Sequence, residues 1–350
     1  MERKNYLDYI RVIAIFAVVG LHVFCDRYMA SVPFKSTSWF FMSGFSSLLR
    51  FADPLFLMIS GAVFLDESRK LSIKKLLLHN FLRLVIVFFI WDFLYGLIVY
   101  ALEFGFSFDM FKVAILNMPS FRYHLWFIPA IAGIYLLVPL LRKVCRKENR
   151  EVVKYFLILG FVTICINSFA RIFDENKIAN YFLRIINIFN PGQFCSYVFY
   201  FVLGWYLEQF INESRYKKPL LIIGLCLVPI SSGVNILFSI LKNRSISLTE
   251  DLFFIVTFFM AVGVFILCKQ LKFANNENKF IKSLSNCSFG IYLIHVAIIE
   301  LLEKFIPEYL AFSGWGFLIL LGMFIVAALG SYALTLLIKL TFRKYSRYIV

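Results

Sequence analysis

The sequence has few charged residues. Aspartate, glutamate, lysine and arginine make up 16% of the 350 residues, whereas soluble domains carry about 25%. Hydrophobic residues reach 61%, which is more than one soluble core can bury. They occur in blocks of about 17–25 residues, the length with which a helix crosses the roughly 30 Å of hydrocarbon in a bilayer. The shortage of charge therefore excludes a soluble domain and predicts an integral membrane protein.

Cysteine pairs and long polar linkers are also missing. None of the seven cysteines forms a CxxC pair, and most lie within apolar blocks, where cysteine acts as a small hydrophobe. We therefore expect no metal site and no disulfide framework. Because the connections are short, we interpret residues 1–350 as a single transmembrane domain. The first block lacks a small-residue cleavage site, so we interpret it as a retained helix rather than a signal peptide.

What is present is a series of ten apolar blocks. The fold predicted is all-α, a polytopic bundle of about ten transmembrane helices. Aromatic and apolar residues in the connections 104–124 and 172–193 indicate short interfacial helices there. We place the transmembrane helices at about 7–25, 39–65, 76–103, 125–141, 155–171, 194–211, 219–239, 252–268, 284–303 and 315–341.

Basic residues are distributed unevenly between the connections. If the N-terminus is cytoplasmic, the inner segments hold 22 lysine and arginine residues and the outer segments hold 9. Cytoplasmic segments of membrane proteins carry such an excess, so we expect both termini in the cytoplasm of a multi-pass protein of the plasma or inner membrane. This bias explains the net charge of +15, and we expect no nucleic-acid partner.

Two ionisable residues of the first block share one helical face. Arg11 and His22 are eleven residues apart, so on an α-helix their directions agree within about 20° and they are about 16 Å apart along the axis. Asp8 lies three residues before Arg11 and can pair with it. Ionisable groups within a bilayer cost about 2.5–3.5 kcal/mol each and usually mark function. The alternative is a snorkelling arginine and a satisfied buried histidine.

Arg83 lies about two turns into the third block, at the same depth as Arg11, with His79 one turn below it. Two arginines at the cytoplasmic mouth of a bundle suit an anionic ligand from the cytosol, such as the phosphates of a nucleotide-bearing donor. Anchoring to lipid headgroups is the alternative.

The other histidines with a candidate function, His124 and His295, fall in the outer half of the bundle together with His22. This separation predicts a passage with a charge-binding inner end and a chemical outer end. For His124, an interfacial position without function is equally compatible with the sequence. Asp26, one turn beyond His22, would orient the imidazole if the helix continues that far.

The second block contains Arg50 and Asp53, whose i, i+3 spacing allows an ion pair that lowers the cost of burial. Pro54 is expected to kink this helix. Ser60 and Gly61 are small, and small residues permit close approach of neighbouring helices.

Several motifs, in their order along the chain, resemble those of the acyltransferase 3 family of membrane O-acyltransferases. Arg11 and His22 form its Arg-x10-His pattern, and the fourth-block motif is similar to that of single-domain O-acetyltransferases of surface polysaccharides. The matching segments are 6–11 (YLDYIR), 54–61 (PLFLMISG), 124–129 (HLWFIP), 135–139 (YLLVP), 204–207 (GWYL) and 292–295 (YLIH).

The resemblance implies that an acyl group, usually acetyl, moves from cytoplasmic acyl-CoA to a hydroxyl of a cell-surface or lipid-linked glycan. Acyl-CoA would be a co-substrate, and no bound cofactor is expected. Arg11 and His22 carry over as the essential catalytic pair, and Arg11 and Arg83 as donor-binding residues. Supporting or substrate-binding positions are Arg50, Asp53, Ser60, His124, Trp126, Tyr292 and His295.

A hydroxyl needs a general base near neutral pH, and histidine suits this task. His22 could take the proton of the acceptor or could itself be acylated first, and the sequence leaves both open. Two other classes of function compete with an enzyme. A transporter or flippase of a lipid-linked saccharide would also need buried charges, although we find no inverted repeat. A sensor or assembly partner in envelope synthesis is the third.

Overall fold

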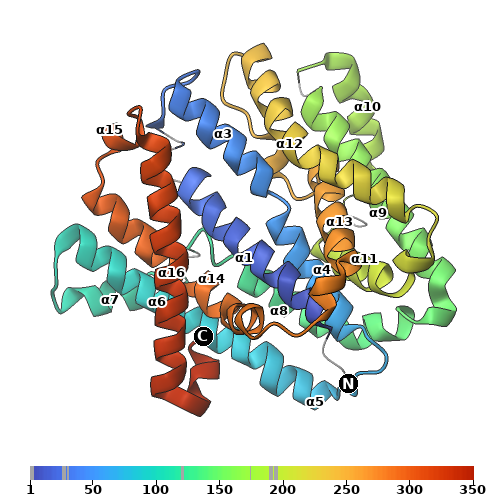
Figure 1. Cartoon of the computed structure of the whole chain (residues 1–350), viewed down its shortest axis with the longest axis horizontal. Coiled ribbons are helices and arrows are strands. Elements are labelled where there is room, and N and C mark those ends of the chain that lie inside the picture. The colour runs from blue at the N-terminus through green and yellow to red at the C-terminus, as the bar shows by residue number, and fades with distance from the viewer. Residues whose placement is uncertain are drawn as a thin grey trace.

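The computed structural model describes residues 4–25, 29, 31–119, 122–173, 175–188, 192 and 196–350. These residues form helices joined by turns, without a β-strand among them, which confirms the all-α class. Figure 1 shows the helices packed side by side around α1. In chain order they are α1 (Asn5–Cys25), α3 (Thr37–Leu49), α4 (Ala52–Phe64), α5 (Ile73–Lys75), α6 (Leu82–Phe104), α7 (Asp109–Leu116), α8 (Phe127–Val144), α9 (Arg150–Ile172), α10 (Lys177–Ile188), α11 (Tyr197–Phe210), α12 (Lys217–Leu241), α13 (Ile255–Gln270), α14 (Lys279–Phe305), α15 (Glu308–Ala311) and α16 (Gly316–Phe342).

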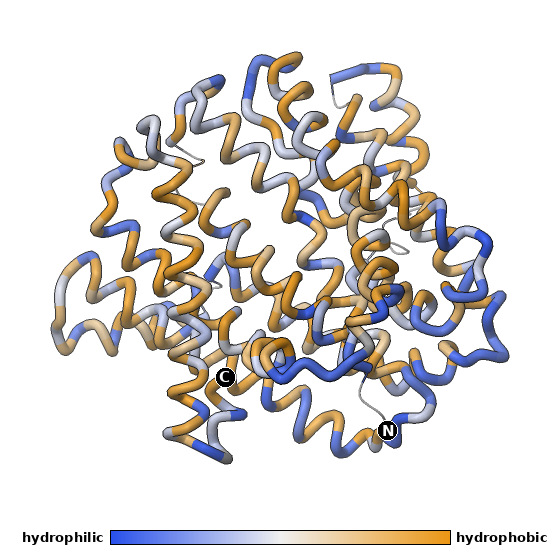
Figure 2. Tube along the Cα trace, in the orientation of Figure 1, coloured by the Kyte–Doolittle hydropathy of each residue, from blue (hydrophilic) through white to orange (hydrophobic). Residues whose placement is uncertain are grey.

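Eight helical segments within the described part of the chain are long and apolar enough to cross a bilayer. Figure 2 shows that hydrophobic residues cover the helices, whereas many hydrophilic ones lie in the connections. The eight segments are Asn5–Cys25, Thr37–Phe64, Ile73–Phe104, Phe127–Val144, Lys147–Ile172, Lys217–Leu241, Lys279–Phe305 and Gly316–Phe342.

The expected count of ten crossings is not reached by these criteria. The expected spans 194–211 and 252–268 correspond to α11 and α13, which have only 14 and 16 residues. Both helices bury most of their side chains against other helices. Both helices are apolar but shorter than the other eight segments, so the count of ten crossings stays a prediction.

The second apolar block is one span of two helices. It runs from Thr37 to Phe64, but α3 ends at Leu49 and α4 begins at Ala52. Pro54 has no N–H to donate to the carbonyl of the residue four positions earlier, which is Arg50. The expected kink is therefore confirmed, and it lies at Arg50 rather than at the proline itself.

Short helices occupy both long connections, as expected. They are α7 and α10, at the periphery in Figure 1. Each exposes large apolar side chains: Ile115 and Leu116 on α7 are 59% and 70% exposed, and Ile178 and Ile188 on α10 are 71% and 78% exposed. Such faces suit contact with lipid at an interface.

An ionic network fixes the N-terminal end of α1. The ammonium group of Lys4 lies 2.8 Å from Asp66, after α4, and 2.9 Å from Glu208 on α11. Glu208 is also 3.0 Å from Lys269 on α13 and accepts a hydrogen bond from Tyr6. Burial alone would raise the pKa of Asp66, but hydrogen bonds from Lys4 and Ser68 hold this pKa below its usual value.

Glycines bring α4 and α11 into backbone contact. A Cβ atom on Gly61 would lie 1.7 Å from the carbonyl oxygen of Phe201, and one on Gly204 would lie 2.0 Å from the carbonyl oxygen of Met58. The expectation that Gly61 permits close packing is therefore confirmed. This contact sets the distance of α4 from its neighbours, and α4 carries Asp53 and Ser60.

Substitution Gly204→Ala should destabilise the fold, because the methyl group can be accommodated only if two helix backbones move apart. We expect a loss of about 1–3 kcal/mol, measured as a lower thermal midpoint of the purified protein in detergent. Gly233→Ala on α12 is the matched control, since a Cβ there meets nothing within 4 Å. An equal midpoint for the two variants would contradict the role of the α4–α11 contact.

Candidate functional site

Arg11 and His22 lie on α1, the helix that is enclosed by α3, α4, α13, α14 and α16. The guanidinium of Arg11 is 3.2 Å from the carboxylate of Asp8, which is 3% exposed, so the expected pair forms. The hydroxyl of Ser285, on α14, donates to the same carboxylate at 2.6 Å. Asp8 therefore holds Arg11 and ties α1 to α14.

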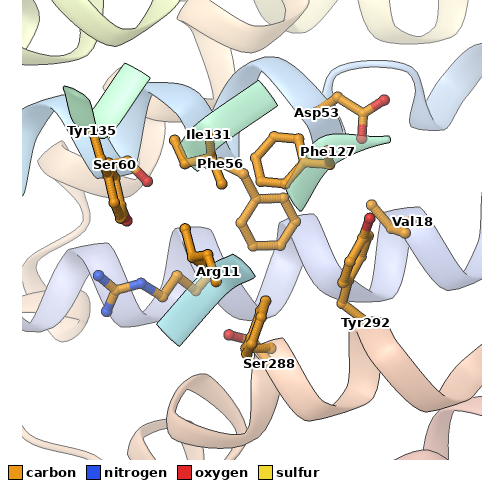
Figure 3. A pocket seen from close by; sticks show the side chains of 12 residues that line it. Arg11, Val18, Asp53, Phe56, Ser60, Phe127, Ile131, Tyr135, Ser288 and Tyr292 are labelled. Atoms are coloured by element: carbon orange, nitrogen blue, oxygen red, sulfur yellow. The ribbon is translucent and has the colours of Figure 1, made fainter. Parts of the chain in front are cut away.

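A cavity of about 140 Å³ extends along α1 from Arg11. In Figure 3, Arg11 and Tyr135 lie at one side, and Asp53, Val18 and Tyr292 lie at the other. Val18 is one helical turn before His22, so the cavity leads from the arginine towards the histidine. Four of the residues singled out by sequence line it: Arg11, Asp53, Ser60 and Tyr292.

Three histidines gather beyond this end of the cavity. They come from α1, from the turn before α8 and from α14. The ring centroid of His22 is 5.1 Å from that of His295 and 6.3 Å from that of His124, and the latter two are 5.8 Å apart. The sequence assigned all three to one half of the bundle, and the fold brings their rings together.

Two of these rings are buried without a full set of hydrogen bonds. His124 is 1% exposed, and neither of its ring nitrogens has a partner among the described residues. His295 is 0% exposed; its Nδ1 is 3.1 Å from the carbonyl oxygen of Ile291, and its Nε2 has no such partner. Tyr292 donates a hydrogen bond to the backbone oxygen of His124 and so holds this turn against α14. Unsatisfied buried nitrogens are uncommon in proteins, and a catalytic role is one of the reasons for which they are retained.

Arg50 and Asp53 do not form the expected ion pair in the described structure. Because the helix breaks at Arg50, the two residues no longer share one helical face. Arg50 instead donates to the Sγ of Cys25 at 2.8 Å and lies 3.9 Å from Glu250. Asp53 lines the cavity, and it interacts electrostatically with His22 and Arg50. Asp53, rather than Arg50, therefore belongs to the cavity.

Two further residues indicated by the sequence are Trp126 and Asp26. Trp126 does not line the cavity; its ring packs 5.4 Å from that of Tyr197 on α11. Trp126 therefore fixes α8 against α11. Asp26 lies outside the described residues.

Arg83 is held by a segment that sequence reasoning missed. Residues 343–350 fold back against α6, where Nε of Arg83 donates to the carbonyl of Arg347 at 2.5 Å and its NH2 donates to the oxygen of Val350 at 3.3 Å. The guanidinium also lies over the ring of Phe289, a residue that lines the cavity. Arg83 is thus next to the cavity, with part of its donor capacity already used.

The mouth of the cavity has more positive charge than the sequence indicated. The charges of Arg11, Arg83 and Arg69 all act on Tyr135, which lines the cavity. In the sequence, Arg69 was one of many basic residues of the inner connections. Tyr135 belonged to a motif, but neither its position beside Ser60 (Figure 3) nor the presence of Ser288 in the cavity lining could be read from spacing along one helix.

The described residues contain no group of three or more histidine, cysteine, aspartate or glutamate side chains that could hold a metal ion.

A family model for an acyltransferase domain matches residues 4–336 of the chain. This is nearly its whole length, and the chain belongs to the acyltransferase 3 family. No curated protein and no solved structure matches it. The match identifies a membrane acyltransferase in general terms. It favours an enzyme over the saccharide transporter that the sequence also allowed.

Substitution Asp8→Ala should weaken both the fold and acyl transfer, because it leaves the partly buried Arg11 without the carboxylate that holds it. We expect a loss of about 2 kcal/mol in stability, measured by thermal unfolding in detergent. Ser285→Ala removes only one hydrogen bond to Asp8 and should cost about 1 kcal/mol. Equal losses of acyl transfer in the two variants would show that Asp8 does not act through Arg11.

Proposed function

We propose that this protein transfers an acyl group, with acetyl preferred, from cytoplasmic acyl-CoA to a hydroxyl of a cell-surface or lipid-linked glycan. Both termini would face the cytoplasm, and the membrane would be the plasma or inner membrane. The observation that carries the proposal is the cavity that runs from Arg11 towards the histidines. Such a cavity would lead from a site for an anionic donor towards a site for base catalysis.

The inner end of the cavity suits the donor. Phosphates are bound most effectively by arginine side chains, and Arg11, Arg69 and Arg83 surround Tyr135 there. His22 is about 16 Å further along α1 by the rise of the helix. A flexible thioester-bearing arm can cover this distance while the nucleotide stays with the arginines. We therefore assign Arg11 and Arg83 to donor binding.

The outer end suits the chemistry. A histidine with an ordinary pKa of about 6.5 is mostly neutral near pH 7 and can accept a proton or act as a nucleophile. His22 is placed beside two further imidazoles and within the field of Asp53. The positive charge that develops on His22 during transfer would be stabilised by this carboxylate.

The acceptor has its own route. A cleft of about 570 Å³ lies at the C-terminal ends of α6 and α14, beyond the histidines. Glu103, Glu303 and Arg122 are among the residues that line it. Arg122 lies 6.0 Å from the ring of Tyr95, and this ring is 4.7 Å from that of His124. Carboxylates and arginine are the groups that hydrogen-bond sugar hydroxyls, so the cleft suits a saccharide on its way to the histidines.

Substitution His22→Ala should abolish acyl transfer without unfolding the protein, because it removes the reactive group and leaves the helix intact. The measurement is transfer of label from radioactive acetyl-CoA to a glycan extract by purified protein. We expect a loss of at least about 100-fold, the usual contribution of a general base. Label transfer that survives the substitution, in protein with an unchanged thermal midpoint, would contradict the role of His22.

Substitution Arg83→Ala should raise the apparent KM for acyl-CoA, since it removes a charge from the donor end, and should leave the KM for the acceptor unchanged. One charge-assisted hydrogen bond corresponds to about 1.5–3 kcal/mol, so we expect an increase on the order of tenfold or more. Arg146→Ala is the control, because Arg146 is exposed and pairs with Glu148 away from the cavity. An unchanged KM in the Arg83 variant would reject the donor-binding role.

A further inference from the structure

Acylation and deprotonation can be divided between two of the buried histidines. Resting on the proposed function, we infer that His22 carries the acyl group as a covalent intermediate and that His295 is the base that activates the acceptor hydroxyl. The structure of the histidine cluster supports this division through the tautomer, the burial and the position of His295.

The tautomer of His295 is fixed by its one hydrogen bond. Its Nδ1 is 3.1 Å from the carbonyl oxygen of Ile291, one turn earlier on α14. A carbonyl oxygen only accepts hydrogen bonds, so Nδ1 must donate and a neutral ring has its lone pair on Nε2. His295 is therefore a base through Nε2, and its ring belongs to the histidine cluster.

The lone pair on Nε2 can accept a hydrogen bond from a ligand. His295 is 0% exposed, and Nε2 has no hydrogen-bond partner among the described residues. Leaving a buried polar atom unsatisfied costs about 1–3 kcal/mol, a cost that a structure retains where a substrate supplies the missing donor. Because Nε2 can only accept, that substrate group must be a donor, as a sugar hydroxyl is.

The base lies beside the atom to be attacked. The ring centroids of His295 and His22 are 5.1 Å apart with a tilt of 41°. At this separation the two rings pack against each other, so a hydroxyl group that donates to Nε2 of His295 would approach at the ring edges, where its oxygen can face an acyl group on His22. Neither ring nitrogen of His124 has a partner within the described part of the chain, so no hydrogen bond there fixes its tautomer, and we assign it no proton transfer.

A two-step acyl transfer uses both histidines, whereas a direct single-step transfer would need only one base. In the first step, a ring nitrogen of His22 attacks the thioester carbonyl, the carbon–sulfur bond breaks, and CoA leaves with the proton that the imidazole loses. In the second step, Nε2 of His295 takes the proton of the acceptor hydroxyl, whose oxygen attacks the acyl carbon. The bond to His22 then breaks, and His22 recovers this proton from His295. Both rings end neutral, and no further reactant is needed.

The test is isotope exchange in the absence of acceptor. Purified wild-type protein, His295→Gln and His22→Ala are incubated with unlabelled acetyl-CoA and labelled free CoA, and the label entering acetyl-CoA is measured. A covalent acyl intermediate permits this exchange, so the wild type should exchange. His295→Gln should exchange at a rate within about threefold of the wild type but transfer acetyl to the glycan about 100-fold more slowly. His22→Ala should do neither.

Each other outcome has a definite meaning. Transfer to the glycan without exchange in the wild type would show a single-step reaction and overturn this inference, while the proposed function would survive. Absence of both activities in the wild type would overturn the proposed function as well. Normal transfer by His295→Gln would show that His295 is not the base.

A second variant separates proton transfer from packing. His295→Ala leaves space for free imidazole, which should restore glycan transfer at least tenfold if the missing function is a base, and should leave exchange unchanged. If neither variant of His295 retains exchange, the two histidines do not act in separate steps and the inference fails.

Discussion

Placing an ionisable side chain in the hydrocarbon of a bilayer costs about 2.5–3.5 kcal/mol, and α1 contains three of them. The fold meets this cost by surrounding α1 with five other helices and supplying partners at each level. At one end, Lys4 and Tyr6 contact Glu208; one turn further, Asp8 holds Arg11. At the other end His22 packs beside His295 of α14, whose Nε2 has no hydrogen-bond partner among the described residues. This nitrogen is therefore an exception to the general rule that buried polar atoms are hydrogen-bonded.

The glycine contact between α4 and α11 acts on the same constraint. Because Gly61 and Gly204 allow the backbones of α4 and α11 to touch, α11 holds α4 on the side away from α1. The distance between α4 and α1 is thereby set. Asp53 and Ser60 then line the cavity without closing it. The break at Arg50 contributes as well, since it turns Asp53 towards the cavity and sends the guanidinium of Arg50 to Cys25. Packing residues with no chemistry of their own thus set the geometry of the charged ones.

Features that depend on a single helix could be predicted from the sequence. The shared face of Arg11 and His22 and the pair of Asp8 with Arg11 follow from helical geometry alone. Features that depend on two or more helices could not. The fold-back of residues 343–350 onto Arg83, the grouping of Arg69 with Arg11 around Tyr135, and the enclosed positions of α11 and α13 arise from tertiary packing. The ion pair of Arg50 and Asp53 failed for the same reason, because i, i+3 spacing has meaning only within an unbroken helix.

The size of the cavity restricts what can pass from the arginines to the histidines. A volume of about 140 Å³ holds a short acyl group and part of a thin chain, but not a nucleotide. Under the proposed function, the nucleotide of acyl-CoA therefore stays at the mouth, and only its thioester end enters. Phe56 and Phe127 line the passage, and their rigid rings leave little room for a long acyl chain. Under the proposed function, the same aromatic walls would keep water from a reactive acyl group. Selection of a short acyl group and protection of that group would thus follow from one small, aromatic-lined cavity.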